Sequence, residues 1–258
     1  MSNKVLGIIP SRYGSSRFPG KPLGMIGNKP MIQHVYENCS KALDYVYVAT
    51  DDERIFDAVQ SFGGKVVMTS KNHANGTERC AEAAMLISAE ENVNFDVIIN
   101  IQGDEPFLDI NQIHDLLRAF ESRDTQIATL IHKIKDKNDL FDIMNVKVAV
   151  NSENEAIYFS RSPIPFLRNV EKDEWLDYHS FYKHIGIYGF RPGVLLEVVK
   201  LMPSPLEKAE SLEQLRWLEN GYKVKCEISE VSETVSVDTP KDLERANEIY
   251  RQMTNGQS

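Results

Sequence analysis

The sequence predicts an α/β fold built on a mostly parallel, doubly wound sheet. Short apolar runs, typical of buried strands, alternate with amphipathic stretches that are typical of helices. Residues 97–101 form a nearly continuous β-rich apolar run, which indicates a strand covered on both faces. With 258 residues, of which 42% are hydrophobic, the chain is long enough to bury one large core.

The first hundred residues give the clearest alternation of elements. In order, the pattern predicts a strand at 5–9, a helix at 30–39, a strand at 45–49, a helix at 53–62, a strand at 65–68, a helix at 78–87 and a strand at 97–101. Thr50 or Asp51 is placed to cap the second of these helices, and Gly63 with Gly64 is placed to end it.

After about residue 133 the pattern changes, with polar and proline-rich connections between the elements. We expect strands at 146–150, 156–159, 184–190, 224–228 and 233–237, helices at 192–201 and 207–219, and a last helix that starts at Thr239-Pro240. Residues 161–179 contain two prolines close together and predict an exposed loop or arm. Since no linker interrupts the chain, the sequence predicts a single domain spanning 1–258, with an arm inserted at about 150–190.

Charge and cysteine content exclude several classes of function. The formal net charge is −9, whereas nucleic-acid binders normally present a basic surface, so we expect no nucleic-acid partner. The three cysteines are far apart and form no C-x-x-C pair, which disfavours a zinc site or a disulfide framework and fits a reducing cytoplasm. The apolar run at the N-terminus is too short for a signal peptide or a membrane span, so no membrane partner is expected.

The loop after the first predicted strand resembles a cradle for a triphosphate. Residues 1–36 contain no Asp or Glu in a chain with 38 carboxylates, and Arg12, Arg17 and Lys21 follow the strand among glycines and serines. Ligands of parallel α/β sheets bind beyond the carboxyl ends of the strands, where glycines let backbone N–H groups approach phosphate oxygens. The spacing does not match a Walker A loop, and no G-x-G-x-x-G is present, which weakens a dinucleotide oxidoreductase. An ordinary Gly/Pro-rich surface loop stays an alternative.

Two aspartates are candidates for a magnesium site. Asp104 follows the predicted strand at 97–101 directly, and Asp238 follows the predicted strand at 233–237. Magnesium prefers oxygen ligands and usually takes one or two carboxylates together with phosphate oxygens and water. Asp104 could instead be a turn residue beside Gly103, and Asp238 could be a helix cap, as we expect for Asp51.

With these features in place, the chain resembles the 3-deoxy-manno-octulosonate (Kdo) cytidylyltransferases, also called CMP-Kdo synthetases, from residue 5 to about residue 250. The resemblance rests on motifs whose order and spacing are specific together, although each is weak alone. They are Ile-Ile-Pro-Ser-Arg-Tyr-Gly-Ser-Ser-Arg-Phe-Pro-Gly-Lys-Pro-Leu, Val-Ala-Thr-Asp, Asn-Gly-Thr-Glu-Arg, Gln-Gly-Asp-Glu-Pro, Tyr-Phe-Ser-Arg, Lys-His-Ile-Gly-Ile-Tyr-Gly-Phe-Arg, Pro-Ser-Pro-Leu-Glu, Glu-Ser-Leu-Glu-Gln-Leu-Arg and Val-Asp-Thr-Pro.

The resemblance implies an enzyme that transfers CMP from CTP to the anomeric hydroxyl of Kdo and releases pyrophosphate, for lipopolysaccharide biosynthesis. It also implies a Rossmann-like nucleotide-diphospho-sugar transferase fold and a homodimer formed partly by a β-containing arm. By this analogy Mg²⁺ is the cofactor, with Asp104 and Asp238 as ligands and Lys21 as a further catalytic residue. The implied CTP-binding residues are Arg12, Ser15, Arg17, Lys21, Arg79 and Gln102.

The implied residues for the sugar acid are Arg161, His184, Tyr188, Glu213 and Gln214. From the residues alone, His184 and Tyr188 would form a half-buried core pair on one face of a strand, and Glu213 and Gln214 would lie on a helix surface. Arg161 is the best unaided candidate, because a guanidinium binds carboxylates bidentately. The 8-amino analogue of Kdo and sialic acid stay alternative substrates, and a CTP-binding regulatory module without catalysis stays an alternative class.

Overall fold

In the computed structural model, which describes residues 3–14, 17–231 and 235–255, the chain forms two compact units. One unit comprises Met1–Ile113 with Glu233–Ser258, and the other comprises His114–Ser232. The helix α4 (Ile110–Arg118) contains the first boundary between them. The expected arm at about 150–190 belongs to the second unit, and the single domain expected from the sequence stays a prediction.

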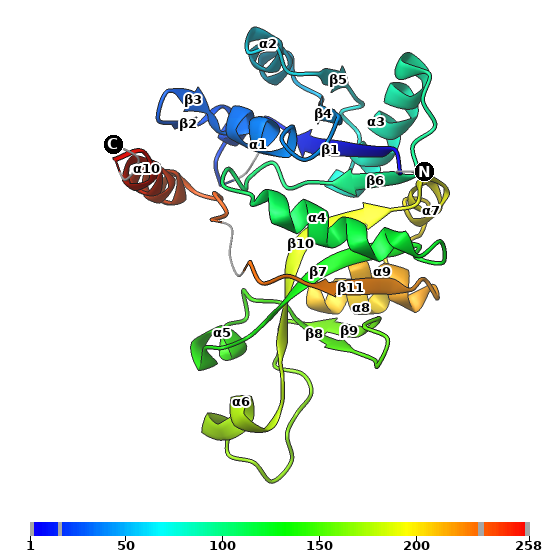
Figure 1. The fold of residues 1–258 in the computed structure, drawn as a ribbon, viewed down its shortest axis with the longest axis vertical. Coiled ribbons are helices and arrows are strands. Elements are labelled where there is room, and N and C mark those ends of the chain that lie inside the picture. The colour runs from blue at the N-terminus through cyan, green and yellow to red at the C-terminus, as the bar shows by residue number, and fades with distance from the viewer. Residues whose placement is uncertain (1–2, 15–16, 232–234, 256–258) are drawn as a thin grey trace. The chain divides into compact units, whose positions relative to one another are not determined.

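The first unit contains a parallel sheet with the strand order β6-β1-β4-β5 (Figure 1). Its strands are β1 (Val5–Ser11), β4 (Tyr45–Thr50), β5 (Val66–Met68) and β6 (Val97–Asn100). All three neighbouring pairs are parallel, with β1 between β4 and β6. Leu6, Ile8 and Ile9 of β1 are fully buried, as expected for a strand covered on both faces. The predicted α/β class with a mostly parallel sheet is confirmed.

Helices join these strands, and further short elements follow β1. The connecting helices are α1 (Met31–Cys39), α2 (Glu53–Ser61) and α3 (Gly76–Glu91). After β1 come the 3₁₀ turn η1 (Lys21–Leu23) and a hairpin of β2 (Met25–Ile26) and β3 (Lys29–Pro30). The last helix, α10 (Pro240–Asn255), packs on this hairpin, where Asn247 accepts a 2.9 Å hydrogen bond from the Gly27 N–H and donates to the Met25 carbonyl.

The second unit is mainly antiparallel. Its strands are β7 (Ile127–Lys133), β8 (Lys147–Val150), β9 (Ala156–Ser160), β10 (Tyr182–Phe190) and β11 (Val224–Ile228). Strand β10 pairs with β7 and β8, and β8 pairs with β9, all antiparallel, whereas β11 pairs with β7 in parallel. Its helices and turns are η2 (Ala119–Glu121), α5 (Lys137–Phe141), η3 (Lys172–Glu174), α6 (Trp175–Tyr178), α7 (Pro192–Val198), α8 (Pro205–Glu210) and α9 (Gln214–Glu219).

Part of the segment expected as an exposed arm packs around one aromatic side chain. Trp175 of α6 is buried and stacks on Phe181, with 5.9 Å between the ring centroids. Leu140 and Ile134 complete this small core. Phe166, by contrast, is largely exposed. The segment therefore has an apolar anchor of its own, which its prolines did not indicate.

Three local predictions were wrong. The N-cap of α2 is Asp52, whose side chain accepts from the Arg54 N–H, and not Thr50 or Asp51. The helix expected at 207–219 is two helices, α8 and α9, since Ser211 adopts a left-handed conformation with φ of 55° between them.

The strand expected at 233–237 is absent from the described part of that range, because 235–237 are irregular; residues 233 and 234 lie outside the described residues. Sequence patterns also missed strand β7 and helix α4, which the structure adds between the expected elements.

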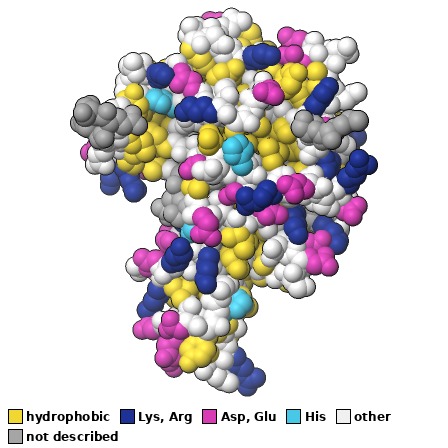
Figure 2. All heavy atoms as spheres, viewed as in Figure 1, with side chains coloured by type: hydrophobic (Ala, Val, Ile, Leu, Met, Phe, Trp, Pro, Cys, Tyr) yellow, Lys and Arg dark blue, Asp and Glu magenta, His cyan; other side chains and the backbone are white. Residues whose placement is uncertain are grey.

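Three general features of the chain are its surface charge, the character of its helices and its cysteines. On the face shown in Figure 2, Lys and Arg side chains are interspersed with Asp and Glu. None of the helices in the described ranges combines the length and the apolar character that a membrane crossing requires. Cys39, Cys80 and Cys226 are all buried free thiols.

Gly27 offers a direct test of how α10 is held against the hairpin. Its φ is +61°, and a Cβ at this position would lie 2.2 Å from the Tyr250 ring of α10. We expect Gly27→Ala to lower the free energy of unfolding by about 2–4 kcal/mol, because overpacking adds to the cost of a left-handed alanine. Gly63→Ala is the matched control, since Gly63 has φ of +77° but open space around it. Urea denaturation should show the larger loss for Gly27→Ala, and equal losses would contradict the packing.

Candidate functional site

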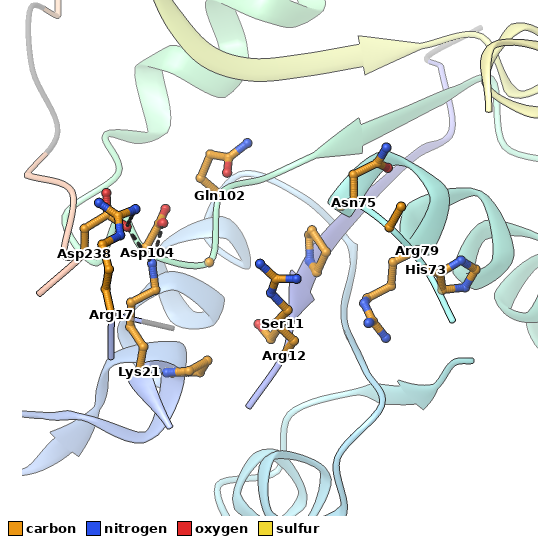
Figure 3. A pocket seen from close by; sticks show the side chains of 15 residues that line it. Ser11, Arg12, Arg17, Lys21, His73, Asn75, Arg79, Gln102, Asp104 and Asp238 are labelled. Carbon is orange, nitrogen blue, oxygen red and sulfur yellow. Dashed lines mark hydrogen bonds and ion pairs between the residues drawn. The ribbon is translucent and has the colours of Figure 1, made fainter. Parts of the chain in front are cut away.

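A pocket of about 450 Å³ lies at the carboxyl ends of β1 and β6 in the first unit (Figure 3). This is the edge of a parallel sheet at which ligands are expected. Every lining residue belongs to the first unit, and the set is Pro10, Ser11, Arg12, Arg17, Lys21, Pro22, His73, Ala74, Asn75, Gly76, Arg79, Gln102, Gly103, Asp104 and Asp238. The pocket thus collects Arg12, Arg17, Lys21, Arg79, Gln102, Asp104 and Asp238, which the sequence singled out. Ser15 lies outside the described residues.

The ammonium group of Lys21 joins the two predicted metal ligands. Its Nζ lies 2.7 Å from Asp104 Oδ2 and 3.1 Å from Asp238 Oδ1. Burial alone would lower the pKa of Lys21, but the charges and hydrogen bonds of Asp104 and Asp238 outweigh it and raise the pKa. Lys21 is therefore a fully charged cation held between two carboxylates.

The backbone around Asp104 explains how the first carboxylate reaches this place. Asp104 lies in the turn after β6, next to Gly103. A Cβ on Gly103 would lie 3.1 Å from Ser11 Oγ and 3.2 Å from the carbonyl oxygen of Pro10. Glycine thus allows the turn to pack closely against the end of β1, which brings Asp104 beside the loop that carries Lys21. Asp104 is therefore a turn residue, and its place in the turn is compatible with its being a candidate metal ligand.

Asp238 reaches the same cation from the other end of the chain. The Val237 N–H donates a 2.9 Å hydrogen bond to the Asp104 carbonyl, so one backbone contact takes the place of the expected strand. The first turn of α10 is capped by Thr239 and Asp242, which bond each other's backbone N–H groups. Asp238 is not the side-chain cap. Its carboxylate is therefore available to Lys21 and to Arg17, whose NH2 lies 3.3 Å away.

The loop between β1 and η1 is closed by its own backbone. The Gly20 N–H donates a 2.9 Å hydrogen bond to the Tyr13 carbonyl, and Gly20 has φ of +72°, a conformation that favours glycine. Lys21 follows at once as the first residue of η1. Arg12, which precedes Tyr13 in the chain, is exposed and lines the pocket. The predicted cradle is thus a closed loop that presents cations to the pocket.

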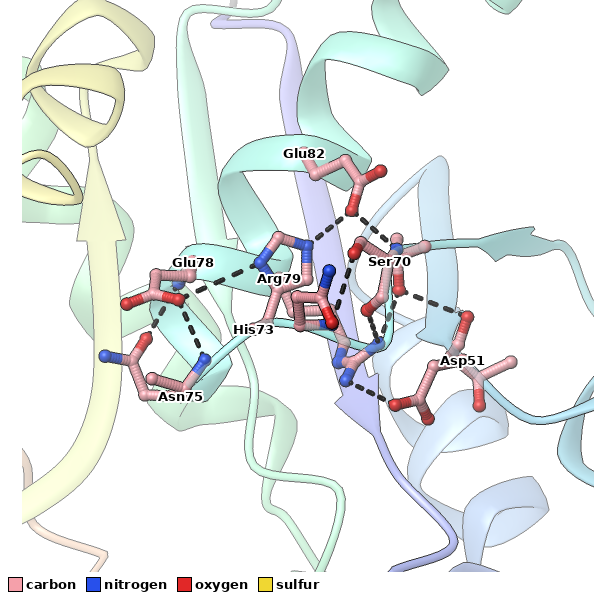
Figure 4. A network of polar contacts seen from close by, with 11 residues as sticks. Asp51, Ser70, His73, Asn75, Glu78, Arg79 and Glu82 are labelled. Carbon is pink, nitrogen blue, oxygen red and sulfur yellow. Dashed lines mark hydrogen bonds and ion pairs between the residues drawn. The ribbon is translucent and has the colours of Figure 1, made fainter.

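Arg79 forms the opposite side of the pocket as part of a buried network (Figure 4). Only 4% of Arg79 is exposed, and its NH2 donates a 3.0 Å hydrogen bond to Asp51 Oδ2. Its NH1 donates to Thr69 Oγ1 at 2.6 Å and to the Ser70 carbonyl at 3.3 Å. Asp51 is therefore the carboxylate partner of a buried guanidinium, which explains why the neighbouring Asp52 caps α2.

The donor set around Lys21 fits a hard divalent cation. Two carboxylate oxygens already hold one cationic group between them, and both aspartates line the pocket. Among the residues that the structure describes, no three His, Cys, Asp or Glu side chains gather as a complete cage. Magnesium needs no such cage, because substrate phosphates and water supply its remaining ligands.

The sugar-acid candidates all lie in the second unit, where His184 and Tyr188 pack together. Their ring centroids are 5.1 Å apart on β10, as expected for two residues on one strand face. His184 Nε2 lies 2.9 Å from Thr129 Oγ1. Burial lowers the pKa of His184 to about 3, so the ring is neutral near pH 7. Burial and the charge of Glu213 raise the pKa of Tyr188, whose hydroxyl is itself buried.

The remaining sugar-acid candidates are less exposed than a helix surface would make them. Gln214 is only 5% exposed at the start of α9, so a surface position is wrong for it. Arg161 is tied down by Glu210, whose Oε2 accepts from the Arg161 N–H and whose carbonyl accepts from its Nε. Its NH1 also donates to the Ile143 carbonyl. The guanidinium is oriented by two hydrogen bonds, which its Nε and NH1 donate to backbone carbonyls.

Comparison with known proteins shows the family to which this chain belongs. A family described as cytidylyltransferases matches residues 6–227. The chain belongs to the cytidylyltransferase family. It is a nucleotidyltransferase, as the resemblance implied.

Relatives agree over nearly the whole chain. A 3-deoxy-manno-octulosonate cytidylyltransferase of Phocaeicola vulgatus is 54% identical, covering 96% of this chain and 98% of the relative. An 8-amino-3,8-dideoxy-manno-octulosonate cytidylyltransferase of Shewanella frigidimarina is 48% identical over 94% and 96% of the two chains. A solved structure of CMP:2-keto-3-deoxy-manno-octonic acid synthetase complexed with CTP has a TM-score of 0.86 at 42% identity and covers 97% and 99% of the two chains.

Some residues of this cytidylyltransferase pocket were missed by the sequence patterns. His73 and Asn75 line it, and Asn75 caps α3 by accepting from the Glu78 N–H, while Glu78 accepts from the Ala74 N–H. The Asn-x-x-Glu spacing is a helix-start signature that would have placed the start of α3 at this point. The pairing of Asp51 with Arg79 had no local signal, because 28 positions separate them.

Replacement of Asp51 tests the network around Arg79. We expect Asp51→Asn to lower the free energy of unfolding by about 2–3 kcal/mol, since a hydrogen bond to a buried charged group is lost or weakened. Asp52→Asn is the matched control and should change stability by less than about 0.5 kcal/mol, because asparagine caps helices as well as aspartate does. Thermal and urea unfolding measure both. A larger loss for Asp52→Asn would contradict the assignment of the cap and the pair.

Proposed function

We propose that the protein transfers CMP from CTP to the anomeric hydroxyl of 3-deoxy-manno-octulosonate, which gives CMP-Kdo and pyrophosphate. The observation that carries this proposal is the convergence of Asp104 and Asp238 on Lys21 in a pocket lined by Arg12, Arg17 and Gln102. Similarity to Kdo cytidylyltransferases at 54% identity and to a structure complexed with CTP supports the choice of both substrates. A regulatory module that only bound CTP would not need the paired carboxylates.

In this proposal the cations of the loop after β1 bind the triphosphate. Arg12, Arg17 and Lys21 all line the pocket, where they compensate the phosphate charges. Arg79 and Gln102 line other parts of the same pocket, and Ser15 belongs to the same loop. Lys21 is the group best placed to shift from the carboxylates toward the phosphates, because it already bears a full charge within the pocket.

We infer that Asp104 and Asp238 hold Mg²⁺ with the nucleotide. The two carboxylates would hold the ion, which would supply charge compensation for the phosphates and activation of the attacking hydroxyl. The chain's part is to offer two oxygens at one point, together with a lysine that compensates the carboxylates when the nucleotide is absent.

The reaction follows as an in-line displacement. The anomeric oxygen of the sugar acid forms a bond to the α-phosphorus of CTP, the bond from that phosphorus to the bridging oxygen breaks, and pyrophosphate leaves. Reactions of this kind depend on positioning and on charge compensation more than on covalent help from the protein. Lys21, with Arg17, stabilises the leaving pyrophosphate. The hydroxyl proton passes to solvent, since no side chain is required as a general base.

For the sugar acid we propose Arg161, His184, Tyr188, Glu213 and Gln214. Oriented donors, a neutral imidazole and a buried hydroxyl suit a ligand with a carboxylate and several hydroxyls. We also propose a homodimer formed partly by the arm at about 150–190, a cytoplasmic location consistent with the free thiols, and a role in lipopolysaccharide biosynthesis.

A pyrophosphate-release assay across nucleotides and sugar acids tests the function. We expect release with CTP and Kdo in the presence of Mg²⁺, and none without the sugar acid or the metal. Parallel reactions contain sialic acid or the 8-amino analogue of Kdo. The name of a relative that is 48% identical includes this analogue. Preference for either would replace Kdo in the proposal. Binding of CTP without release under any condition would favour the regulatory module.

Removal of Lys21 should show how much the pocket depends on its charge. We expect Lys21→Ala to reduce turnover at least about 100-fold with folding intact, as is common when one group that stabilises transition-state charge is lost. The control is Lys41→Ala, since Lys41 is exposed and donates to Asn38 outside the pocket. Asp104→Asn should cause a loss of similar size. Near-normal turnover in either pocket variant would remove that residue from the mechanism.

A further inference from the structure

The wall of the pocket formed by residues 69–76 is held in place by side chains of α3. Residues 69–75 connect β5 to α3 without regular structure, and His73, Ala74 and Asn75 line the pocket together with Gly76, the first residue of α3. An irregular segment needs partners for its backbone polar groups. The N–H groups of Ser70 and Ala74 find their partners in the first two turns of the helix that follows, as Figure 4 shows.

One carboxylate oxygen carries two of these contacts. Glu82 Oε2 accepts a 2.8 Å hydrogen bond from the Ser70 N–H and another from His73 Nε2. The first contact fixes the start of the segment and the second fixes a side chain at the pocket. Glu78 adds a separate contact through the Ala74 N–H at 2.8 Å, and its Oε2 lies 3.9 Å from His73 Nδ1. The imidazole therefore lies between two carboxylates, of which Glu82 is the nearer.

Glu82 itself does not line the pocket. Burial alone would raise its pKa, but hydrogen bonds from His73 and Ser70, with the charge of Arg79, outweigh burial and lower it. An ionised Glu82 is a strong acceptor, since hydrogen bonds to charged groups are stronger than neutral ones. Its influence on a ligand must pass through the two residues that it holds.

The position of this wall indicates which part of a nucleotide it meets. In Figure 3, Arg17, Lys21, Asp104 and Asp238 lie at one end of the pocket, whereas His73, Asn75 and Arg79 lie at the other. Triphosphate charge favours the end with Lys21 and the two carboxylates. The base and ribose are then left for the end with His73.

We propose that Glu82 is a positioning residue for the nucleoside part of the bound nucleotide, acting through His73 and the Ser70 amide. The proposal rests on the proposed function, because it takes a nucleotide as the ligand of the pocket. It assigns Glu82 to the affinity of the nucleotide and not to the transfer step.

Calorimetric titration with CTP and Mg²⁺, combined with steady-state kinetics, tests this assignment. We expect Glu82→Ala and His73→Ala each to weaken CTP binding about tenfold, since each loses contacts to a charged group. The double variant should lose no more than about twentyfold, because both changes remove one shared interaction. KM for CTP should rise in parallel, while kcat at saturating CTP stays within about twofold. Glu90→Ala, an exposed carboxylate on the same helix, is the control and should bind as the unchanged protein does.

Several outcomes would overturn the proposal. Unchanged binding by Glu82→Ala, a loss of about a hundredfold in the double variant, or a fall in kcat with KM unchanged would each exclude it. If Glu82→Ala does not fold, Glu82→Gln replaces it, because glutamine keeps one acceptor oxygen and should show a smaller loss. Hydrogen exchange of peptides covering 69–76 gives a readout without ligand, and it should rise in the Glu82 variant but not in Glu90→Ala. Should the unchanged protein not bind CTP, the proposed function fails, and the exchange result still decides whether Glu82 holds this wall.

Discussion

The pocket depends on a balance of charge around the Lys21 ammonium. Two carboxylates without a counterion at this partly buried place would repel each other, and a lysine without them would lose charge on burial. Together they form a compact group that holds the loop after β1, the turn after β6 and the segment before α10 at one point. The group thus offers both negative oxygens and a positive ammonium at one place in the pocket.

A second network fixes the other side of the pocket with different chemistry. Arg79 is buried and divides its donors between Asp51, Thr69 and a backbone carbonyl. This use of a guanidinium as a cross-link between β4, the segment after β5 and α3 leaves less of it for a ligand. One side of the pocket is therefore held by ion pairs among Arg17, Lys21 and the two aspartates, and the other by the hydrogen bonds of a buried guanidinium.

Sequence patterns predicted the strands β1, β4 and β6 and the position of the cationic loop, because apolar runs and their polar ends are local signals. They also predicted that Asp104 and Asp238 could lie close together, although the described residues of the range 233–237 do not form the expected strand. The hydrogen bond from the Val237 N–H to the Asp104 carbonyl and the shared contacts with Lys21 hold them together, and no local pattern encodes these contacts. The Asp51–Arg79 pair and the Glu82 contacts were missed for the same reason, since side-chain partners are chosen by the folded geometry. The break between α8 and α9 was missed because the residue with a left-handed backbone there is Ser211, whereas glycine is the residue that usually marks such a position.

The order of these parts along the chain has a consequence for biosynthesis. Lys21 and Asp104 emerge early from the ribosome, whereas Asp238 and the helix that packs on the β2–β3 hairpin come more than two hundred positions after Lys21. A growing polypeptide accordingly carries the loop and one carboxylate for most of its synthesis without the second. The group formed by Lys21 and the two carboxylates is therefore complete only after the segment before the last helix has been made.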